Sequence, residues 1–283
     1  MSSDLSEINL VSILSALEEL VSESNQLIVN LLKRGAYVSH KDSGLPGELV
    51  TEIDEAVDLH LNESLLKLIP GSGWQSEESD SSPSTVAGSP TWVVDPIDGT
   101  SNLVHNPGAG EYGTSIALFV NQELSLGVIG LPLGFSRNPE DSAVITGVIS
   151  LDELPVRVNG EPLTSGDTNP VGVVISWHDR WVRQVIPEET PVYAVGSVVM
   201  RLALVATGQS EMYVSTGLAQ GFRSHYALHD VAGGAAIVRA ANKDLYDSDC
   251  EPVELRLEHR NVRPFVAGSE QQATQFIKNV LVG

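Results

Sequence analysis

The sequence predicts a layered α/β protein, in which helices and sheets stack on one another. Segments with apolar side chains at helical spacing alternate with short β-branched runs in both halves of the chain, and such interleaving is typical of stacked sheet and helix layers. With 283 residues, the chain can bury a large core as one domain or as two packed lobes.

The first half is predicted to contain two helices followed by strands. Apolar side chains recur at helical spacing over residues 6–33, and Arg34-Gly35 marks the end of that helix. A second helix is expected over residues 48–68, and the Ser-, Pro- and Gly-rich stretch 76–90 is expected to form a surface loop. The expected strands are 91–94, 113–120, 124–131 and 155–158, with a loop at 137–141.

The sequence pattern changes near residues 160–170. We expect a boundary there between two lobes, residues 1–160 and 161–283. Helices are predicted beyond it at 198–207 and 230–241, and Ser269 is expected to cap a last helix that runs to residue 280. The strands predicted in this half are 171–176, 212–214, 245–246 and 262–267.

Composition excludes several classes of function. A net charge of −21 argues against nucleic-acid binding and against an anionic membrane surface, because both need a basic face. It is compatible with a small phosphorylated substrate, since bound divalent cations can invert the local field. Cys250 is the single cysteine, so an intrachain disulfide or a multi-thiolate zinc site is excluded. No apolar run reaches membrane-spanning length, and we expect a soluble cytoplasmic protein.

The most informative motif is the turn Asp95-Pro96-Ile97-Asp98-Gly99-Thr100, which follows the apolar run Trp92-Val93-Val94. It sets two carboxylates three residues apart at the end of a buried strand, where they repel each other unless a cation lies between them. Pro, Asp and Gly are also ordinary turn residues. A turn with capping aspartates is therefore the alternative.

Three other acidic features accompany this turn. They are Asp54 in Leu49-Val50-Thr51-Glu52-Ile53-Asp54, the pair Glu77-Glu78, and Asp230 before the small residues of Val231-Ala232-Gly233-Gly234. Taken singly, each has a structural alternative: a surface helix residue, a solvated charge pair and an N-cap, respectively. Their order along the chain, with Asp95 and Asp98 between them, makes a shared site the better interpretation.

That order resembles the inositol monophosphatase family, the lithium-sensitive type of magnesium-dependent phosphatase, from about Leu49 to the C-terminus. The resemblance also includes Val158-Asn159-Gly160-Glu161-Pro162-Leu163, Gly196-Ser197-Val198 and Ala206-Thr207-Gly208. It implies an alternating α-β-α-β-α sandwich of the inositol monophosphatase and fructose bisphosphatase type. The first lobe would hold an antiparallel sheet and the second a mixed sheet, with the active site between them. The resemblance also implies a homodimer.

The resemblance implies two or three Mg²⁺ ions, which prefer oxygen ligands. Glu77, Asp95 and the backbone carbonyl of Ile97 would hold one ion. Asp95, Asp98 and Asp230 would hold a second, and a third would contact Glu77 through water.

The resemblance assigns the remaining roles as follows. Asp54 and Thr100 would orient the attacking water, and Glu77 would share in catalysis. Gly99 and Thr100 would receive phosphate oxygens on their N–H groups at a helix start. Lys41 falls near a lysine that neighbours the metal site in relatives.

The chain departs from the family in the region that borders the leaving-group pocket. Trp usually precedes the late aspartate, and here the residue is His229, for which a packed or solvent-facing role is the first expectation. Ser215 stands where relatives often carry a glutamate, and the segment 214–229 is several residues longer. We therefore hypothesise that Arg223, together with His225, meets a polar or anionic group of a different substrate.

The predicted function is a Mg²⁺-dependent phosphoric monoester hydrolase for a small polyol, cyclitol or sugar phosphate, acting through a metal-activated water. The alternative within the class is a phosphatase for a biosynthetic nucleoside or sugar phosphate or a bisphosphate. A non-enzymatic regulatory relative that binds metal or phosphate is the alternative outside it.

Overall fold

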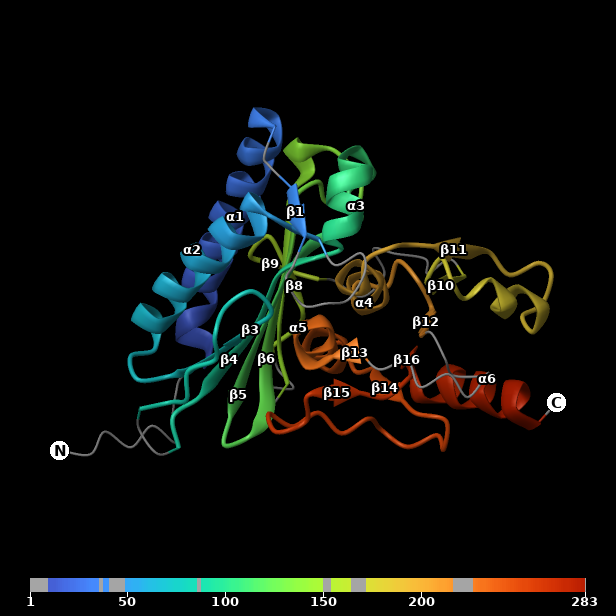
Figure 1. Ribbon diagram of the computed structural model, residues 1–283. Coiled ribbons are helices and arrows are strands. Elements are labelled where there is room, and N and C mark those ends of the chain that lie inside the picture. The colour runs from blue at the N-terminus through green and yellow to red at the C-terminus, as the bar shows by residue number, and fades with distance from the viewer. Residues whose placement is uncertain are drawn as a thin grey trace.

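The structure is a computed structural model that describes residues 10–35, 38–40, 49–85, 88–149, 154–163, 172–215 and 226–282. Its elements form five layers, helix–sheet–helix–sheet–helix, as Figure 1 shows. Helices α1 (Leu10–Arg34) and α2 (Glu52–Leu68) form the first layer, and α4 (Val198–Ala206) and α5 (Leu228–Ala240) lie between the sheets. Helix α6 (Glu270–Val282) covers the far side. The predicted α-β-α-β-α sandwich is confirmed.

The first sheet has seven strands in the order β3-β4-β5-β6-β7-β8-β9. All neighbours are antiparallel except β3 and β4, which run parallel. The strands are β3 (Gly73–Ser76), β4 (Thr91–Asp98), β5 (Gly113–Val120), β6 (Glu123–Leu131), β7 (Ala143–Val148), β8 (Arg157–Val158) and β9 (Glu161–Pro162).

The second sheet is mixed, with five strands in the order β11-β10-β12-β16-β14. The first three run parallel and the last three antiparallel. They are β11 (Val192–Ala194), β10 (Val173–Ile175), β12 (Met212–Val214), β16 (Val266–Gly268) and β14 (Asp244–Tyr246).

Shorter elements complete the fold. Helix α3 (Thr100–His105) follows β4 directly, and single 3₁₀ turns occur at Pro107–Ala109, Pro139–Asp141 and Arg180–Gln184. Two-stranded ladders join β1 (Val38–His40) to β2 (Leu49–Thr51) and β13 (Tyr226–Ala227) to β15 (Asn261–Val262).

Residue alternation along β4 determines which layer each side chain enters. Trp92 and Val94 pack in the core formed with α1 and α2, whereas Val93 packs in the core formed with α4 and α5. Successive side chains on a strand point to opposite faces. Asp95, two residues after Val93, therefore points toward α5.

Several element predictions need correction. The second helix begins at Glu52 rather than at residue 48, because Thr51 is its N-cap and residues 49–51 form β2. The strand predicted at 262–267 is two short strands, β15 and β16. Strand β3 occupies residues 73–76, next to the predicted loop, and β7 was not predicted.

Strands β1, β9, β11 and β13 were not predicted either. The other predicted helices and strands lie close to their predicted ranges. The proposed lobe boundary at residue 160 stays a prediction, because residues 164–171 lie outside the described part of the chain. Across the ranges described, no helix combines the length and the apolar character needed to cross a bilayer.

Candidate metal centre and active site

Strand β5 positions the start of helix α5 beside Asp95. Ser115 is the register partner of Asp95, and its hydroxyl donates a hydrogen bond to the backbone carbonyl of His229, 3.0 Å away. The helix approaches so closely that a Cβ at Gly233 would lie 2.6 Å from Ser115 Oγ. The first turn of α5, with His229 and Asp230, is thereby held against the carboxylate that β4 presents.

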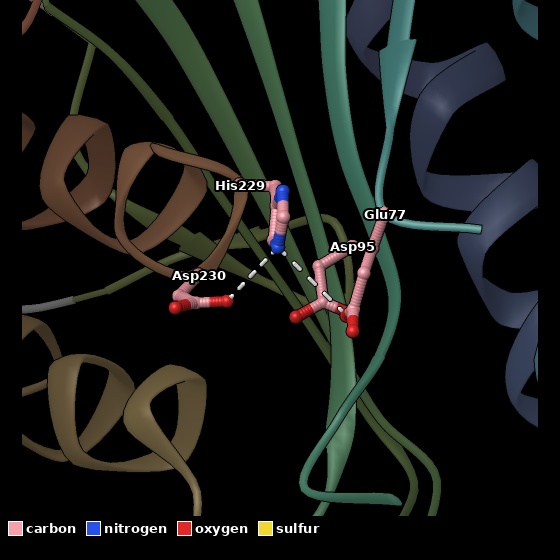
Figure 2. A group of neighbouring side chains, drawn as sticks. All are labelled: Glu77, Asp95, His229 and Asp230. Carbon is pink, nitrogen blue, oxygen red and sulfur yellow. Dashed lines mark ion pairs between the residues drawn. The ribbon is translucent and has the colours of Figure 1, made fainter. Parts of the chain in front are cut away.

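Glu77, Asp95, His229 and Asp230 form one cluster, which we call the carboxylate–histidine cluster. One ligand atom from each lies within 4.8 Å of the others. His229 Nε2 is 3.3 Å from Asp230 Oδ1 and 3.8 Å from Glu77 Oε2. Figure 2 shows the four side chains converging from β4, from the segment after β3 and from α5.

Glu77 reaches the cluster because β3 runs parallel to β4. Its backbone N–H donates to the carbonyl of Val94, 3.2 Å away, which continues the pairing past the end of β3. The preceding hydroxyl, on Ser76, donates to the carboxylate of Asp58 in α2. These bonds place the Glu77 backbone beside Asp95.

Asp95 is the buried centre of the cluster, with 1% of its surface exposed. Burial raises the pKa of its carboxyl well above the usual range, and the charges of Glu77, Asp98 and Asp230 raise it further. A carboxylate in such surroundings is stabilised in its ionised form by a cation. Three carboxylates and one imidazole within this distance are a donor set that fits a divalent metal ion.

Asp98 links the first sheet to the N-terminus of α4. Its Oδ2 accepts hydrogen bonds from the Ser197 hydroxyl and from the Val199 N–H, the latter at 2.9 Å. Burial raises the pKa of Asp98, while the bond from Ser197 lowers it, as does the charge of buried Arg201. Asp98 lies outside the four-residue cluster, although its charge acts on Asp95.

Asp54 and Thr100 form a hydrogen-bonded pair across 46 positions of sequence. Asp54 belongs to a capping box with Thr51 at the start of α2, which uses its Oδ2. Its Oδ1 accepts from the Thr100 hydroxyl at 2.8 Å. Burial raises the pKa of Asp54, and the hydrogen bonds from Thr51 and Thr100 lower it.

The turn between β4 and α3 needs glycine at its tightest point. Gly99 has φ = 91°, and a Cβ there would lie 2.6 Å from the Glu111 carbonyl. Strand pairing shifts register between Asp95 and Asp98, and such irregularities re-aim side chains. The Ile97 carbonyl points at the Thr100 hydroxyl, 3.0 Å away.

The predicted site residues therefore fall into three groups. The first, comprising Glu77, Asp95 and Asp230, is brought together directly. The second comprises Asp54, Thr100, Gly99, Ile97 and Asp98, which lie on β4, on the turn that follows it and at the starts of α2 and α3, outside the four-residue cluster. Lys41, Arg223 and His225 lie outside the described residues.

Ser215 is fully buried at the end of β12. Its hydroxyl accepts a 2.6 Å hydrogen bond from the Phe265 N–H, and its own N–H donates to the Phe265 carbonyl. The contact with substrate hydroxyls stays a prediction for this residue.

Two residues of the site carried no predicted role. His229 was expected to be packed or solvent-facing, and it lies within the cluster instead. Its position next to Asp230 at a helix start was the available signal. Ser197 caps α4 and holds Asp98. A serine before an apolar helical run is a recognised capping pattern.

Comparison with known proteins agrees with this geometry. The chain is 27% identical to inositol monophosphatase 1 of Bos taurus over 246 residues, which is 83% of each chain. Its fold superposes on the extragenic suppressor protein suhB of Bartonella henselae with a TM-score of 0.72 and 20% identity, covering 95% of this chain and 98% of the other. An IMPase/NADP phosphatase complexed with Mg²⁺ and phosphate gives a TM-score of 0.72 at 17% identity, covering 96% of each chain.

A sequence model described as the inositol monophosphatase family matches residues 9–280, nearly the whole chain. The match includes both the turn at Asp95 and the helix start at Asp230. The chain belongs to the inositol monophosphatase family, a family of phosphatases.

Proposed function

We propose that the protein is a Mg²⁺-dependent phosphomonoesterase that hydrolyses a small polyol, cyclitol or sugar phosphate. The observation that carries the proposal is the meeting of Glu77, from the segment after β3, and Asp230, from the start of α5, at the buried Asp95 of β4. Carboxylates held this close are costly without a cation. Membership of a Mg²⁺-dependent family supports the same interpretation.

The proposed ligands are the predicted ones. Glu77, Asp95 and the Ile97 carbonyl would hold one ion, Asp95, Asp98 and Asp230 a second, and Glu77 a third through water. Bound Mg²⁺ supplies Lewis-acid stabilisation to the phosphoryl group and to the departing alkoxide.

Asp54 and Thr100 are proposed to orient the water that attacks phosphorus. The Thr100 hydroxyl hydrogen is directed to Asp54 Oδ1 or to the Ile97 carbonyl. The lone pairs of Thr100 Oγ1 are then available to accept a hydrogen bond from water. This bond would direct a lone pair of the water oxygen away from Asp54 and Thr100. In-line attack would form a bond from the water oxygen to phosphorus and break the bond from phosphorus to the alcohol oxygen, with a net transfer of one proton from the attacking water to that oxygen.

The turn at Gly99 is proposed to receive the phosphate. Its N–H and that of Thr100 stand at the start of α3, and the missing side chain leaves their approach open. These donors would fix the phosphoryl oxygens while Thr100 Oγ1 holds the water on the side of phosphorus opposite the departing alcohol oxygen.

The identity of the alcohol is a separate part of the proposal. The relative from Bos taurus is named for inositol monophosphate, which makes that ester the first candidate. The presence of Ser215 in place of a glutamate supports a different leaving group, such as a nucleoside or another sugar. Arg223 and His225 are the residues we propose to contact it.

A panel of phosphate esters, assayed for phosphate release with Mg²⁺ and with EDTA, tests the function. We expect Mg²⁺-dependent hydrolysis of at least one cyclitol or sugar phosphate and none in EDTA. Absence of turnover on every ester would favour a regulatory protein that binds metal or phosphate.

An Arg223→Ala variant tests the pocket in the same panel. We expect loss of activity on the preferred ester and little change on poor ones. An equal loss on all esters, or no loss, would contradict the assignment of Arg223.

We also propose a homodimer, as the family resemblance implies. Light scattering should then give twice the 30.2 kDa mass of one chain, and a monomer mass would overturn this part.

A further inference from the structure

The side chain of His229 occupies a place in the site that the proposed roles leave unassigned. The Nε2 end of its ring points toward the carboxylates of Asp230 and Glu77, at 3.3 and 3.8 Å. The side chain is 18% exposed. It is the nitrogen donor of a cluster whose other members, among the residues described, offer oxygen.

Backbone contacts fix the helix turn that carries His229. The His229 carbonyl accepts the hydrogen bond from Ser115, and Gly233 one turn later packs against β5. Asp230 is fixed in turn by the hydrogen bond that its Oδ2 accepts from the Ala227 N–H, at 2.9 Å. The position of the His229 backbone thus follows from the packing of α5 on the sheet.

Donor chemistry separates Mg²⁺ from other divalent ions. Mg²⁺ is a hard cation that takes oxygen ligands and keeps several waters. Imidazole is a borderline ligand that suits Co²⁺, Ni²⁺ and Zn²⁺, and at a given nitrogen-containing site affinity rises from Mn²⁺ through Co²⁺ to Ni²⁺. One imidazole among three carboxylates therefore favours transition-metal ions over Mg²⁺.

We propose that His229 Nε2 is a direct metal ligand, so that the carboxylate–histidine cluster binds a divalent transition-metal ion such as Co²⁺ or Ni²⁺ more tightly than it binds Mg²⁺. This inference rests on the metal site of the proposed function and adds a ligand to it. Glu77, Asp95 and Asp230 would supply the oxygen ligands beside the imidazole nitrogen.

Direct binding measurements test the inference without any substrate. Metal-free protein is titrated calorimetrically with Co²⁺ and with Mg²⁺, as wild type and as His229→Phe, which keeps a ring and removes both nitrogens. We expect the substitution to weaken Co²⁺ binding about tenfold or more and Mg²⁺ binding less than about threefold.

His60→Phe is the matched control. Its Nε2 also lies 3.8 Å from a glutamate, Glu23, in the packing of α2 on α1, away from the cluster. We expect this variant to bind both ions as wild type does.

Pulsed EPR of the wild-type protein loaded with Mn²⁺ gives a readout that needs no variant. A directly bound imidazole nitrogen produces a ¹⁴N coupling, which should be present in wild type and in His60→Phe and absent in His229→Phe. Absence of the coupling in wild type would overturn the inference, as would equal weakening of Co²⁺ and Mg²⁺ in His229→Phe.

The two proposals can fail separately. Mg²⁺-dependent phosphate release without a ¹⁴N coupling would support the phosphatase function and reject His229 as a metal ligand. A ¹⁴N coupling without turnover of any ester would support His229 as a metal ligand and reject the phosphatase function.

Discussion

At Asp95, folding and metal binding make opposite demands on one carboxyl group. The side chain is buried beside Glu77, Asp98 and Asp230, and each of these carboxylates raises its pKa. Without a cation, ionising Asp95 costs stability. Asp95, the central carboxylate of the proposed metal site, therefore lowers the unfolding free energy of the metal-free protein.

Asp95→Asn is therefore expected to stabilise the metal-free protein. A carboxyl group whose pKa is higher in the folded than in the unfolded protein contributes fully to folding stability only below its unfolded pKa. This contribution to the unfolding free energy is lost as the pH rises through the folded pKa. The advantage of the variant should be small at acid pH and reach at least about 1 kcal/mol at pH 8.

Denaturant unfolding in EDTA at several pH values measures this difference. Exposed Asp80 provides the matched control, since Asp80→Asn should leave stability nearly unchanged. Equal stability of wild type and Asp95→Asn at pH 8 would contradict the account of Asp95.

The side chain of Thr100 is expected to act through its hydroxyl group. Thr100→Val keeps the shape and removes the bond to Asp54, so kcat should fall about 10²-fold with little change in Mg²⁺ affinity. Thr100→Ser keeps the hydroxyl and should retain activity within about tenfold. Steady-state kinetics compare them, and an active Thr100→Val would sink the assigned role.

Sequence reasoning at this scale identified the acidic residues and missed the imidazole. The spacing of Asp95 and Asp98 on a turn, and their order with Glu77 and Asp230, carries chemical meaning in the sequence itself. The placement of the His229 backbone depends on the hydrogen bond from Ser115, which lies 114 positions away on another element. No local pattern contains that information.

At the scale of elements, the approach of α5 to the first sheet sets the site. A Cβ at Gly127 on β6 would lie 2.1 Å from the Gly233 carbonyl and 2.7 Å from Ala236 Cβ. The absent side chains let the helix lie directly on the strands. This contact carries His229 and Asp230 to Asp95.

Gly127→Ala is expected to push α5 off the sheet and to destabilise the fold by about 1–3 kcal/mol. Gly108→Ala is the control, because a Cβ there meets nothing within 4 Å and its φ is not in the left-handed region. Thermal unfolding measures both. If the Gly127→Ala protein were as stable as Gly108→Ala, close contact between α5 and the first sheet would not be needed for stability.

The sequence predicted long elements better than short ones. Helix α1 and strand β5 follow clear apolar periodicity, and their predicted ranges match the structure closely. Strand β3 has four residues and exists because Gly73–Ser76 pairs with Thr91–Val94. That pairing depends on a partner strand fifteen or more residues away, so the local sequence pattern of residues 73–76 does not predict it.

At the scale of the whole molecule, the site is assembled from both ends of the chain. Glu77 and Asp95 come from the first sheet and Asp230 from the helix layer behind it, while the Asp98–Ser197 bond ties that sheet to α4. An ion that bridges these elements binds the folded state alone. Metal binding and global stability are therefore coupled.

Mg²⁺ is expected to stabilise the whole fold through this coupling. At about 100 times its dissociation constant, the gain in unfolding free energy should be about 2.7 kcal/mol. Calorimetric melting with Mg²⁺ and with EDTA measures it, and Asp95→Asn should lose most of the gain. A Mg²⁺ effect of equal size in that variant would place the binding elsewhere.

The most direct test of the central claim is phosphate release by wild type and Asp95→Asn across a Mg²⁺ titration, starting from EDTA-treated protein. We expect phosphate release to rise with Mg²⁺ to saturation in wild type and to be about 10³-fold lower in Asp95→Asn at every Mg²⁺ concentration. Wild-type turnover that persists in EDTA, or an Asp95→Asn protein as active as wild type, would contradict it.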